Sequence, residues 1–348
     1  MIDKSKLICT TPFKYTDVFD DKQFLCCPGW LDADVSVGKS IQENFNSKKA
    51  QDVRESILDG SYKYCNEKQC PHLSGLTQDK FLDKRFVEKN ENTLEHFNLI
   101  SEIESVGFSF DRSCNLQCPS CRVDLINYLG KERKAVDIKL DELNKEISKT
   151  IKRMYITGTA DPFYSKSFRQ FLINLEPSNY PKLESIHIHS NGILWTKQLW
   201  DRMNRIHPFV KSCEISIDAA SKNTYEKEVR IGGDWEALKK QLEFIVNIRT
   251  INYFSFSFVV QDKNYKEMYD FYELITDLTK EVKKDISIFF NHIVNWGTYT
   301  ESEFLNRDVA NTAHKLHSDF LVELKKVHNL KNVSHNFNHL LKRKIKLI

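Results

Sequence analysis

The stretch Cys114-Asn115-Leu116-Gln117-Cys118-Pro119-Ser120-Cys121 sets three thiols in the spacing C-x3-C-x2-C. It directly follows a strand-like run that begins at Val106. Three thiolates from one short loop can hold three corners of a cubane iron–sulfur cluster and leave the fourth iron without a protein ligand. An iron with an open position can bind a small molecule. A structural zinc site is the alternative, but structural zinc prefers four closed ligands, so the spacing favours the cluster.

The remaining cysteines are concentrated near the N-terminus. The chain has 348 residues and nine cysteines, eight of them within the first 121 residues. We see no signal-peptide core at Met1–Lys6, so we expect a cytoplasmic protein in which thiols bind a metal or cluster rather than form disulfides. Four thiolates suffice for a second site, and the candidates are Cys9, one of Cys26 and Cys27, Cys65, and Cys70. From spacing alone, a second cluster and structural zinc stay equally open.

Composition excludes several classes of function. Hydrophobic residues make up 41% and charged residues 28% of the chain, as in a soluble globular protein. The net charge of +3 gives no reason to expect a nucleic-acid partner, and no apolar run approaches the length of a membrane span. We therefore expect neither nucleic acid nor membrane as a partner.

From residue 106 the chain alternates strand-like runs with helical patterns, which indicates parallel strands joined by helical crossovers. Polar side chains such as His187 and His189 share one face of their strand, and apolar ones such as Ile186 and Ile188 share the other. Helices would cover the apolar face, and the polar face would line a cavity. The expected strands are Val106–Asp111, Arg153–Thr157, Ser185–Ser190, Ser212–Asp218, Tyr253–Val260 and Asp285–Phe290.

These patterns predict an α/β fold: a partial (β/α)6 TIM-like barrel with a small N-terminal cysteine-rich domain and a C-terminal helical extension. The N-terminal segment is expected to contain a hairpin that turns at Asp20-Asp21 and a helix over 40–58. The predicted boundaries are 1–75 for the cysteine-rich domain, 76–104 for a helical linker, 105–297 for the barrel and 298–348 for the extension.

The three-cysteine loop after the first barrel strand resembles that of the radical S-adenosylmethionine (radical SAM) superfamily. The resemblance implies a [4Fe-4S] cluster whose open iron binds S-adenosylmethionine. Reduction of the cluster would cleave the cofactor to a 5′-deoxyadenosyl radical, which abstracts hydrogen from a substrate. The reaction class would be that of an oxidoreductase or transferase, and a flavodoxin or ferredoxin would supply the electron.

The ends of later strands are similar to the family's cofactor-binding turns, and ligand groups at strand C-termini are usual in β/α barrels. The loop after the second strand resembles the one that receives the methionine amino group. Other positions resemble the sites that reach the ribose and the carboxylate. Ser120 stands where many members carry an aromatic residue. The implied contacts are Gly158, Thr159, Asp161, Pro162, Asn191, Ser216, Asp218 and Arg230.

The N-terminal cysteine segment resembles the auxiliary-cluster modules called SPASM or twitch domains, although here it precedes the barrel. It implies one auxiliary [4Fe-4S] cluster and a peptide or protein substrate that is cross-linked, epimerised or oxidised. The same chemistry on a small metabolite, such as a sugar or nucleotide-linked compound, is the alternative. A zinc-stapled binding protein without catalysis is the alternative of another class.

Overall fold

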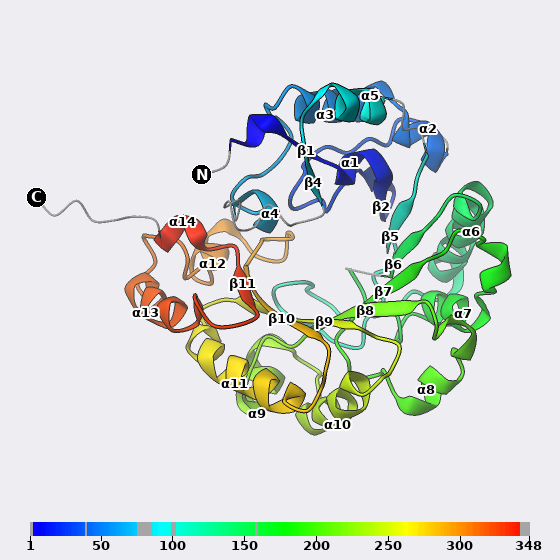
Figure 1. The fold of residues 1–348 in the computed structure, drawn as a ribbon. Coiled ribbons are helices and arrows are strands. Elements are labelled where there is room, and N and C mark those ends of the chain that lie inside the picture. The colour runs from blue at the N-terminus through cyan, green and yellow to red at the C-terminus, as the bar shows by residue number, and fades with distance from the viewer. Residues whose placement is uncertain (1–2, 39, 75–84, 99–101, 157–158, 342–348) are drawn as a thin grey trace, which may run out of the picture. The chain divides into compact units, whose positions relative to one another are not determined.

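The computed structural model describes residues 3–38, 40–74, 85–98, 102–156 and 159–341. Their contacts divide the chain into two compact units, which Figure 1 shows as one ribbon. Unit 1 comprises Met1–Asp111, Gly130–Thr159 and Glu176–Ser185, and unit 2 comprises Arg112–Leu129, Ala160–Leu175 and Ile186–Ile348. The predicted domain boundaries remain predictions.

Unit 1 combines the N-terminal segment with the first strands of the barrel. Strands β2 and β3 form an antiparallel hairpin at Asp20, as expected, and β2 also pairs in parallel with β5, which pairs in parallel with β6. A separate antiparallel pair joins β1 to β4. The elements are β1 (Leu7–Cys9), α1 (Thr11–Lys14), β2 (Tyr15–Phe19), β3 (Lys22–Phe24), α2 (Ile41–Phe45), α3 (Lys48–Leu58), α4 (Pro71–Ser74), β4 (Phe86–Glu88), α5 (Glu91–Asn98), β5 (Ser105–Ser109), α6 (Gly130–Ile147) and β6 (Arg153–Ile156).

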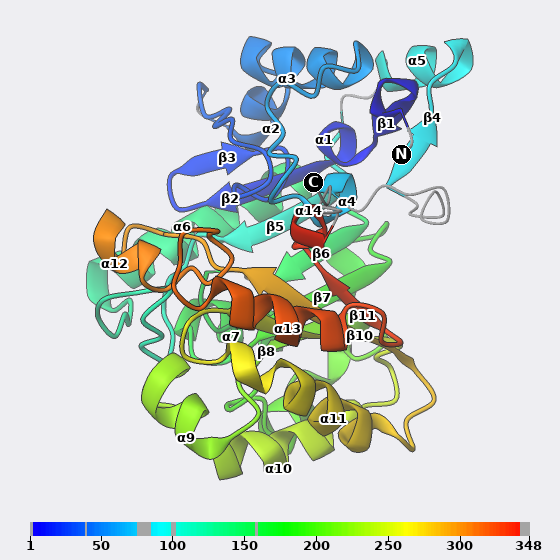
Figure 2. The ribbon, with the colours of Figure 1, turned by 90° about the vertical axis from the view of Figure 1, so that its left-hand side faces the viewer.

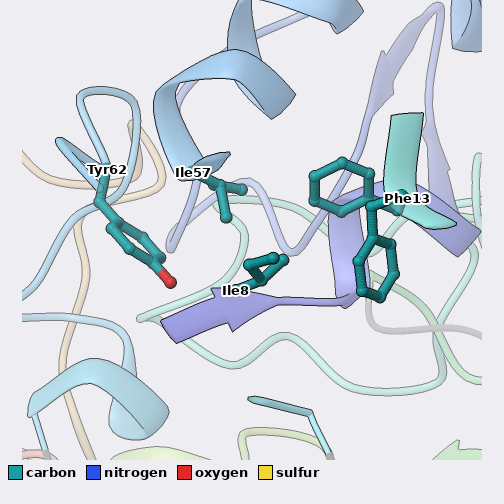
Figure 3. Close-up of a cluster of buried hydrophobic side chains, with 5 residues drawn as sticks. Ile8, Phe13, Ile57 and Tyr62 are labelled. Atoms are coloured by element: carbon teal, nitrogen blue, oxygen red, sulfur yellow. The ribbon is translucent and has the colours of Figure 1, made fainter. Parts of the chain in front are cut away.

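A small hydrophobic cluster holds the N-terminal part of unit 1 together. Figure 3 shows Ile8 of β1, Phe13 of α1 and Ile57 of α3 packed beside Tyr62, and each is at most 2% exposed. Tyr62 adds a polar anchor, because its hydroxyl donates to the Leu7 carbonyl at 2.9 Å. Burying each such side chain contributes roughly 1.5–3 kcal/mol, so this cluster helps to hold β1 against α3.

Unit 2 contains a parallel sheet in the strand order β11-β10-β9-β8-β7. Helices α10 and α11 lie along one side of these strands in Figures 1 and 2. Its elements are α7 (Lys166–Asn174), β7 (Ser185–Ser190), α8 (Lys197–Asp201), β8 (Val210–Ser216), α9 (Lys222–Thr224), a π-helix (Tyr225–Val229), α10 (Trp235–Val246), β9 (Tyr253–Val260), α11 (Met268–Thr279), β10 (Asp285–His292), α12 (Glu301–Leu305), α13 (His317–Val327), β11 (Val333–His335) and α14 (Asn338–Leu341).

The apolar and polar faces fall as the sequence predicts. In β7, Ile186 and Ile188 are fully buried while His187 and His189 stay partly exposed. Along α10, Leu238, Leu242 and Ile245 are buried at helical spacing. The α/β class with a parallel sheet, consistent with a partial TIM-like barrel, is confirmed.

The structure also differs from the sequence prediction in several places. The helix expected over 40–58 is broken, because Ser47 caps a new helix by accepting from the Ala50 amide. Within the expected linker, β4 and α5 occupy 86–88 and 91–98. The expected helical extension contains the strand β11, and its helix α13 begins only at His317. The strands β4 and β11 have three residues each, too few for periodicity to reveal them.

No helix among the described residues is long and apolar enough to cross a membrane.

Candidate active site

The loop that carries the three thiols lies in unit 2, and backbone hydrogen bonds hold its first residue and its middle. The Cys114 amide donates to the Ile126 carbonyl at 3.0 Å, and the Gln117 amide donates to the Ile231 carbonyl at 2.9 Å. Leu116 is fully buried between Cys114 and Cys118, which are 6% and 5% exposed. A buried apolar residue inside the motif thus holds the loop in a fixed shape around the sulfurs.

Each of the three sulfurs has a nitrogen donor from the protein. The Leu116 amide lies 3.4 Å from the Cys114 sulfur. Arg230 Nη1 lies 3.6 Å from the Cys118 sulfur, and Arg122 Nη2 lies 3.4 Å from the Cys121 sulfur. Asn191 Nδ2 adds a second, longer contact to Cys114 at 3.7 Å. Amide and guanidinium donors stabilise thiolates, which is the form of cysteine that binds iron.

Burial opposes ionisation of these thiols when no cation is present. It raises the pKa of Cys114 to about 12 and also raises the pKa of Cys118. The charge of Arg122 lowers the pKa of Cys114, and the charge of Arg230 lowers the pKa of Cys118, but burial has the larger effect. Two guanidinium groups beside three thiols favour the thiolate form, which is the form that binds an iron–sulfur cluster. Among the described residues, no group of three or more His, Cys, Asp or Glu side chains is arranged to bind a single metal ion. The fit to a cluster rests on the chemistry of these donors.

Asp161, predicted to contact the cofactor, has its carboxylate fully occupied within the protein. It is completely buried, and burial raises its pKa. Each oxygen accepts two hydrogen bonds, which uses the acceptor positions of the group. The donors are Phe163 N at 3.0 Å, Tyr164 N at 3.2 Å, Ser190 Oγ at 2.7 Å and Asn191 N at 2.9 Å. Asp161 therefore ties the loop after β6 to the turn after β7.

That turn, Ser190-Asn191-Gly192, places Asn191 beside the thiol loop. Asn191 Nδ2 donates to Asn115 Oδ1 at 2.9 Å in addition to its contact with the Cys114 sulfur. Gly192 has φ +83°, and a Cβ there would lie 3.1 Å from the Leu238 side chain of α10. Only glycine fits both the left-handed backbone and this packing, so the expected turn has a structural basis.

Asp218 and Arg230 form a buried ion pair at the end of β8. Arg230 Nη2 lies 2.8 Å from Asp218 Oδ2, and their side chains are 11% and 3% exposed. Asp218 has φ +64°, a strained conformation for a residue with a side chain, and its Oδ1 accepts from the Val259 amide at 2.8 Å. Strain held in place by surrounding contacts is typical of functional sites.

Arg230 retains one donor that the protein does not use. Its Nε is buried and has no hydrogen-bond partner among the described residues. A guanidinium that bridges the Cys118 sulfur and Asp218 and still has a free N–H can bind an anionic group such as a carboxylate. The π-helix Tyr225–Val229 precedes Arg230, and π-helical turns often occur at functional sites.

A polar network on the strands adjoins this pair. His189 Nε2 lies 2.7 Å from Ser216 Oγ and 3.6 Å from Glu214 Oε1, and Ser216 also contacts Ser257 Oγ at 3.1 Å. His187 contacts Ser212 Oγ at 2.8 Å, and burial lowers its pKa to about 4. Both histidines of β7 are therefore hydrogen-bonded to serine hydroxyls of β8.

The remaining predicted cofactor contacts are Gly158, Thr159 and Pro162, in the loop after β6. Gly158 lies outside the described residues. Thr159 Oγ1 donates to the Ser109 carbonyl at 3.1 Å within unit 1, and Pro162 is buried in unit 2. Arg122 is a site residue that sequence reasoning missed. Its position directly after the third cysteine was the available signal, since a cation beside a thiol favours the thiolate.

The N-terminal thiols come together in unit 1. Cys9 interacts electrostatically with Cys26, Cys65 and Cys70, and Cys27 interacts with Cys26 and Cys70. Burial raises the pKa of Cys9 to about 11 and the pKa of both Cys27 and Cys65 to about 12. Segments that are widely separated in sequence thus bring the five candidates together, and each interacts electrostatically with at least two of the others.

These thiols also have stabilising partners. Arg85 lowers the pKa of Cys9 and Cys26 through its charge, although burial has the larger effect. Hydrogen bonds from the backbone amides of Gly29 and Trp30 likewise lower the pKa of Cys27. An amide two residues after a cysteine also contacts Cys114 in the other loop.

Comparison with known proteins gives one family match. Residues 108–275 match the family model of the Radical SAM superfamily. The structure of native anSMEcpe with bound AdoMet and Cp18Cys peptide is similar at 15% identity and a TM-score of 0.38, covering 55% of this chain and 51% of that one. The structure of TYW1 with a lysine-pyruvate adduct bound is similar at 13% identity and a TM-score of 0.37, covering 72% and 79%. The present chain thus spans about half the length of the first of these structures. No curated protein matches the chain.

Proposed function

We propose that this chain, whose residues 108–275 match the Radical SAM family model, is an enzyme in which Cys114, Cys118 and Cys121 hold a [4Fe-4S] cluster that binds S-adenosylmethionine. The observation that carries the proposal is the separate nitrogen donor beside each of the three sulfurs. When bound and reduced, the cluster supplies cleavage of the cofactor to a 5′-deoxyadenosyl radical, which abstracts hydrogen from the substrate.

The residues around the loop then have distinct roles. Arg122 and Arg230 offset the negative charge of the thiolates. Arg230, through its unused Nε, would bind the methionine carboxylate, and Asp218 would fix the orientation of the guanidinium. Asp161 acts as a positioning residue for the turn at Asn191. Ser216 adjoins Asp218 and is the candidate for the ribose hydroxyls. Thr159, Pro162 and Gly158 belong to the loop proposed for the amino group, through backbone contacts.

We further propose that the N-terminal thiols hold an auxiliary [4Fe-4S] cluster. Cys9, Cys65 and Cys70 supply three ligands. Of the two adjacent cysteines we favour Cys27, because its sulfur is stabilised by backbone amides as the Cys114 sulfur is. Amide donors to sulfur are among the contacts that tune iron–sulfur clusters.

The first experiment measures cluster content and cofactor cleavage together. Protein purified without oxygen should contain iron and acid-labile sulfide, and with dithionite and S-adenosylmethionine it should release 5′-deoxyadenosine. Cys114→Ala should abolish the release, because one of three ligands is lost. Cys213→Ala is the matched control, since Cys213 is a fully buried thiol outside both sets. Zinc without iron or sulfide would instead support the binding-protein alternative.

We propose a peptide or protein as the substrate, on the resemblance of the N-terminal segment to auxiliary-cluster modules that act on peptides. A perdeuterated cell extract can be divided by size into a peptide and protein fraction and a small-molecule fraction. Hydrogen abstraction transfers deuterium to 5′-deoxyadenosine, which mass spectrometry detects. We expect deuterium only with the larger fraction. Deuterium only with the small-molecule fraction would favour the metabolite alternative.

A further inference from the structure

The carboxylate of Asp17 on β2 is buried with one oxygen unused. Asp17 is 7% exposed, and its Oδ1 has no hydrogen-bond partner among the described residues. An unsatisfied buried acceptor is rare in folded proteins, because it loses its hydrogen bonds to water and gains none in return. Such a group requires either a proton or a ligand.

Asp17 belongs to a row of residues that crosses three strands of unit 1. In the sheet register Asp17 lies opposite Gly107 of β5, and Gly107 lies opposite Tyr155 of β6. A side chain at position 107 would collide with the Tyr15 hydroxyl, and its Cβ would lie 2.6 Å from Asp17 Oδ1. The glycine therefore leaves space that the carboxylate and the phenol occupy together.

Two aromatic rings flank this row. Tyr15 and Tyr155 meet edge to face, with ring centroids 5.6 Å apart and planes at 83°. Tyr155 is 38% exposed, so the row is buried at Asp17 and opens to solvent at β6. Tyr155 is therefore the member of the row that a ligand from solvent would contact first.

Among the described residues, no cation acts on the pKa of Asp17. Arg153, in the same sheet row as Tyr15, donates instead to Ser105 Oγ at 2.9 Å. Tyr15 and Ser109 are the hydrogen-bonding neighbours of Asp17, and the Cys27 thiol is a titratable group in electrostatic range. Burial raises the pKa of Asp17 to about 6, and only Tyr15 and Ser109 oppose that rise. A buried carboxylate without a cationic partner is costly, and a cationic ligand would remove the cost.

We propose that Asp17, Tyr15 and Tyr155 form a binding subsite for an aliphatic ammonium group. Asp17 Oδ1 accepts a hydrogen bond from the ammonium, which also forms a charge pair with the carboxylate. The faces of the two tyrosine rings attract the same cation, as aromatic rings do. The phenols add no competing charge. A neutral side chain of the same length would bury the carboxylate without a donor and bind more weakly.

This subsite rests on the proposed function in one respect: the ammonium belongs to the substrate. A lysine side chain of a peptide or protein has the matching chemistry, as does a peptide N-terminus. Binding requires no turnover, however. The protein can therefore release 5′-deoxyadenosine without binding an ammonium group at Asp17. It can also bind the ammonium group there without releasing 5′-deoxyadenosine.

The test compares two probes that differ only in the charged end, N-acetyl-lysine amide and N-acetyl-norleucine amide. Calorimetric titration of the anaerobic, cluster-loaded protein should show the lysine probe binding at least ~10-fold more tightly. Asp17→Asn, which keeps the shape of the side chain, should reduce that preference to less than about twofold. Tyr155→Ala, at a partly exposed position, should reduce it by about threefold.

Asp21→Asn is the matched control, because Asp21 is an exposed carboxylate at the end of the same hairpin. It should leave the preference unchanged. The proposal is overturned if the wild-type protein binds the two probes equally, or binds neither at the highest soluble concentration. It is also overturned if Asp17→Asn keeps the full preference for lysine, which would place the ammonium elsewhere.

Discussion

The guanidinium group of Arg230 makes two different contacts in the candidate active site. It contacts the Cys118 sulfur, pairs with Asp218 and keeps a buried Nε without a partner among the described residues. A lysine could preserve the charge but not the fork of donors that joins the two contacts. Arg230 therefore contacts a thiol of the three-cysteine loop and can also bind an anionic group through its Nε.

We predict that Arg230→Lys weakens S-adenosylmethionine binding by about 10- to 100-fold, since one charge-assisted hydrogen bond to a carboxylate is lost. Equilibrium binding to the reconstituted protein measures the effect. Arg249→Lys, at an exposed position, is the control and should bind normally. An unchanged affinity in Arg230→Lys would show that the carboxylate binds elsewhere.

Asp17 gives a prediction for pH. Its pKa is raised by burial from 3.8 to about 6. Well below pH 3.8 the group is protonated in both the folded and the unfolded chain, so it does not affect the free energy of unfolding. As the pH rises from about 4 to about 6, the unfolded chain ionises first, so the folded state loses up to about 3 kcal/mol.

Asp17→Asn should therefore gain stability over the wild-type protein across that interval, as measured by urea unfolding of the cluster-free chain at several pH values. The two proteins should differ little below pH 4 and most above pH 6. A difference that does not change with pH would mean that Asp17 is not a buried ionising group.

At the scale of elements, the turn after β8 is fixed by a residue from another segment. Glu267 lies between β9 and α11, and its carboxylate accepts four hydrogen bonds from the turn that follows Asp218. The donors are Ala220 N at 2.7 Å, Ser221 N at 3.1 Å, Ser221 Oγ at 2.7 Å and Thr224 Oγ1 at 2.5 Å. This network accounts for how the strained backbone of Asp218 is maintained.

Glu267→Gln should lower the free energy of unfolding by about 1–3 kcal/mol, because an amide cannot accept all four bonds. It should also weaken S-adenosylmethionine binding, although Glu267 lies outside the proposed contacts. Thermal unfolding and cofactor titration measure the two effects. Glu273→Gln, exposed on α11, is the control. Loss of stability with normal binding would show that the turn does not support the site.

At the scale of the whole molecule, each thiol set belongs to its own compact unit. Cys114, Cys118 and Cys121 lie in unit 2 with Asn191, Asp218 and Arg230, whereas the five N-terminal cysteines lie in unit 1. Each unit therefore contains all the proposed ligands of one cluster. The two clusters should form independently.

Cys65→Ala tests this independence. We expect iron to fall from about eight to about four per chain, as one [4Fe-4S] cluster is lost. Cleavage of S-adenosylmethionine should continue, while turnover of the substrate should stop. Iron and sulfide analysis with a 5′-deoxyadenosine assay measures both. Unchanged iron in the variant would rule out Cys65 as a ligand.

By itself, the sequence predicted the elements that depend on local pattern. The strands Ser185–Ser190 and Tyr253–Val260 begin and end where alternation predicts, because period-two burial is a property of consecutive residues. The spacing of Cys114, Cys118 and Cys121 predicted the loop for the same reason. These features need no knowledge of distant residues.

Tertiary structure decided what depends on residues far apart in the chain. Only the fold places Asp17 opposite Gly107 and Arg230 beside the Cys118 sulfur. It also brings donors from the turn after β7 to the carboxylate of Asp161. Short strands such as β2 and β11 also form only because β5 and β10 offer an edge for pairing. Local pattern fixes which face of an element is buried, whereas the partner on that face comes from packing across the sheet.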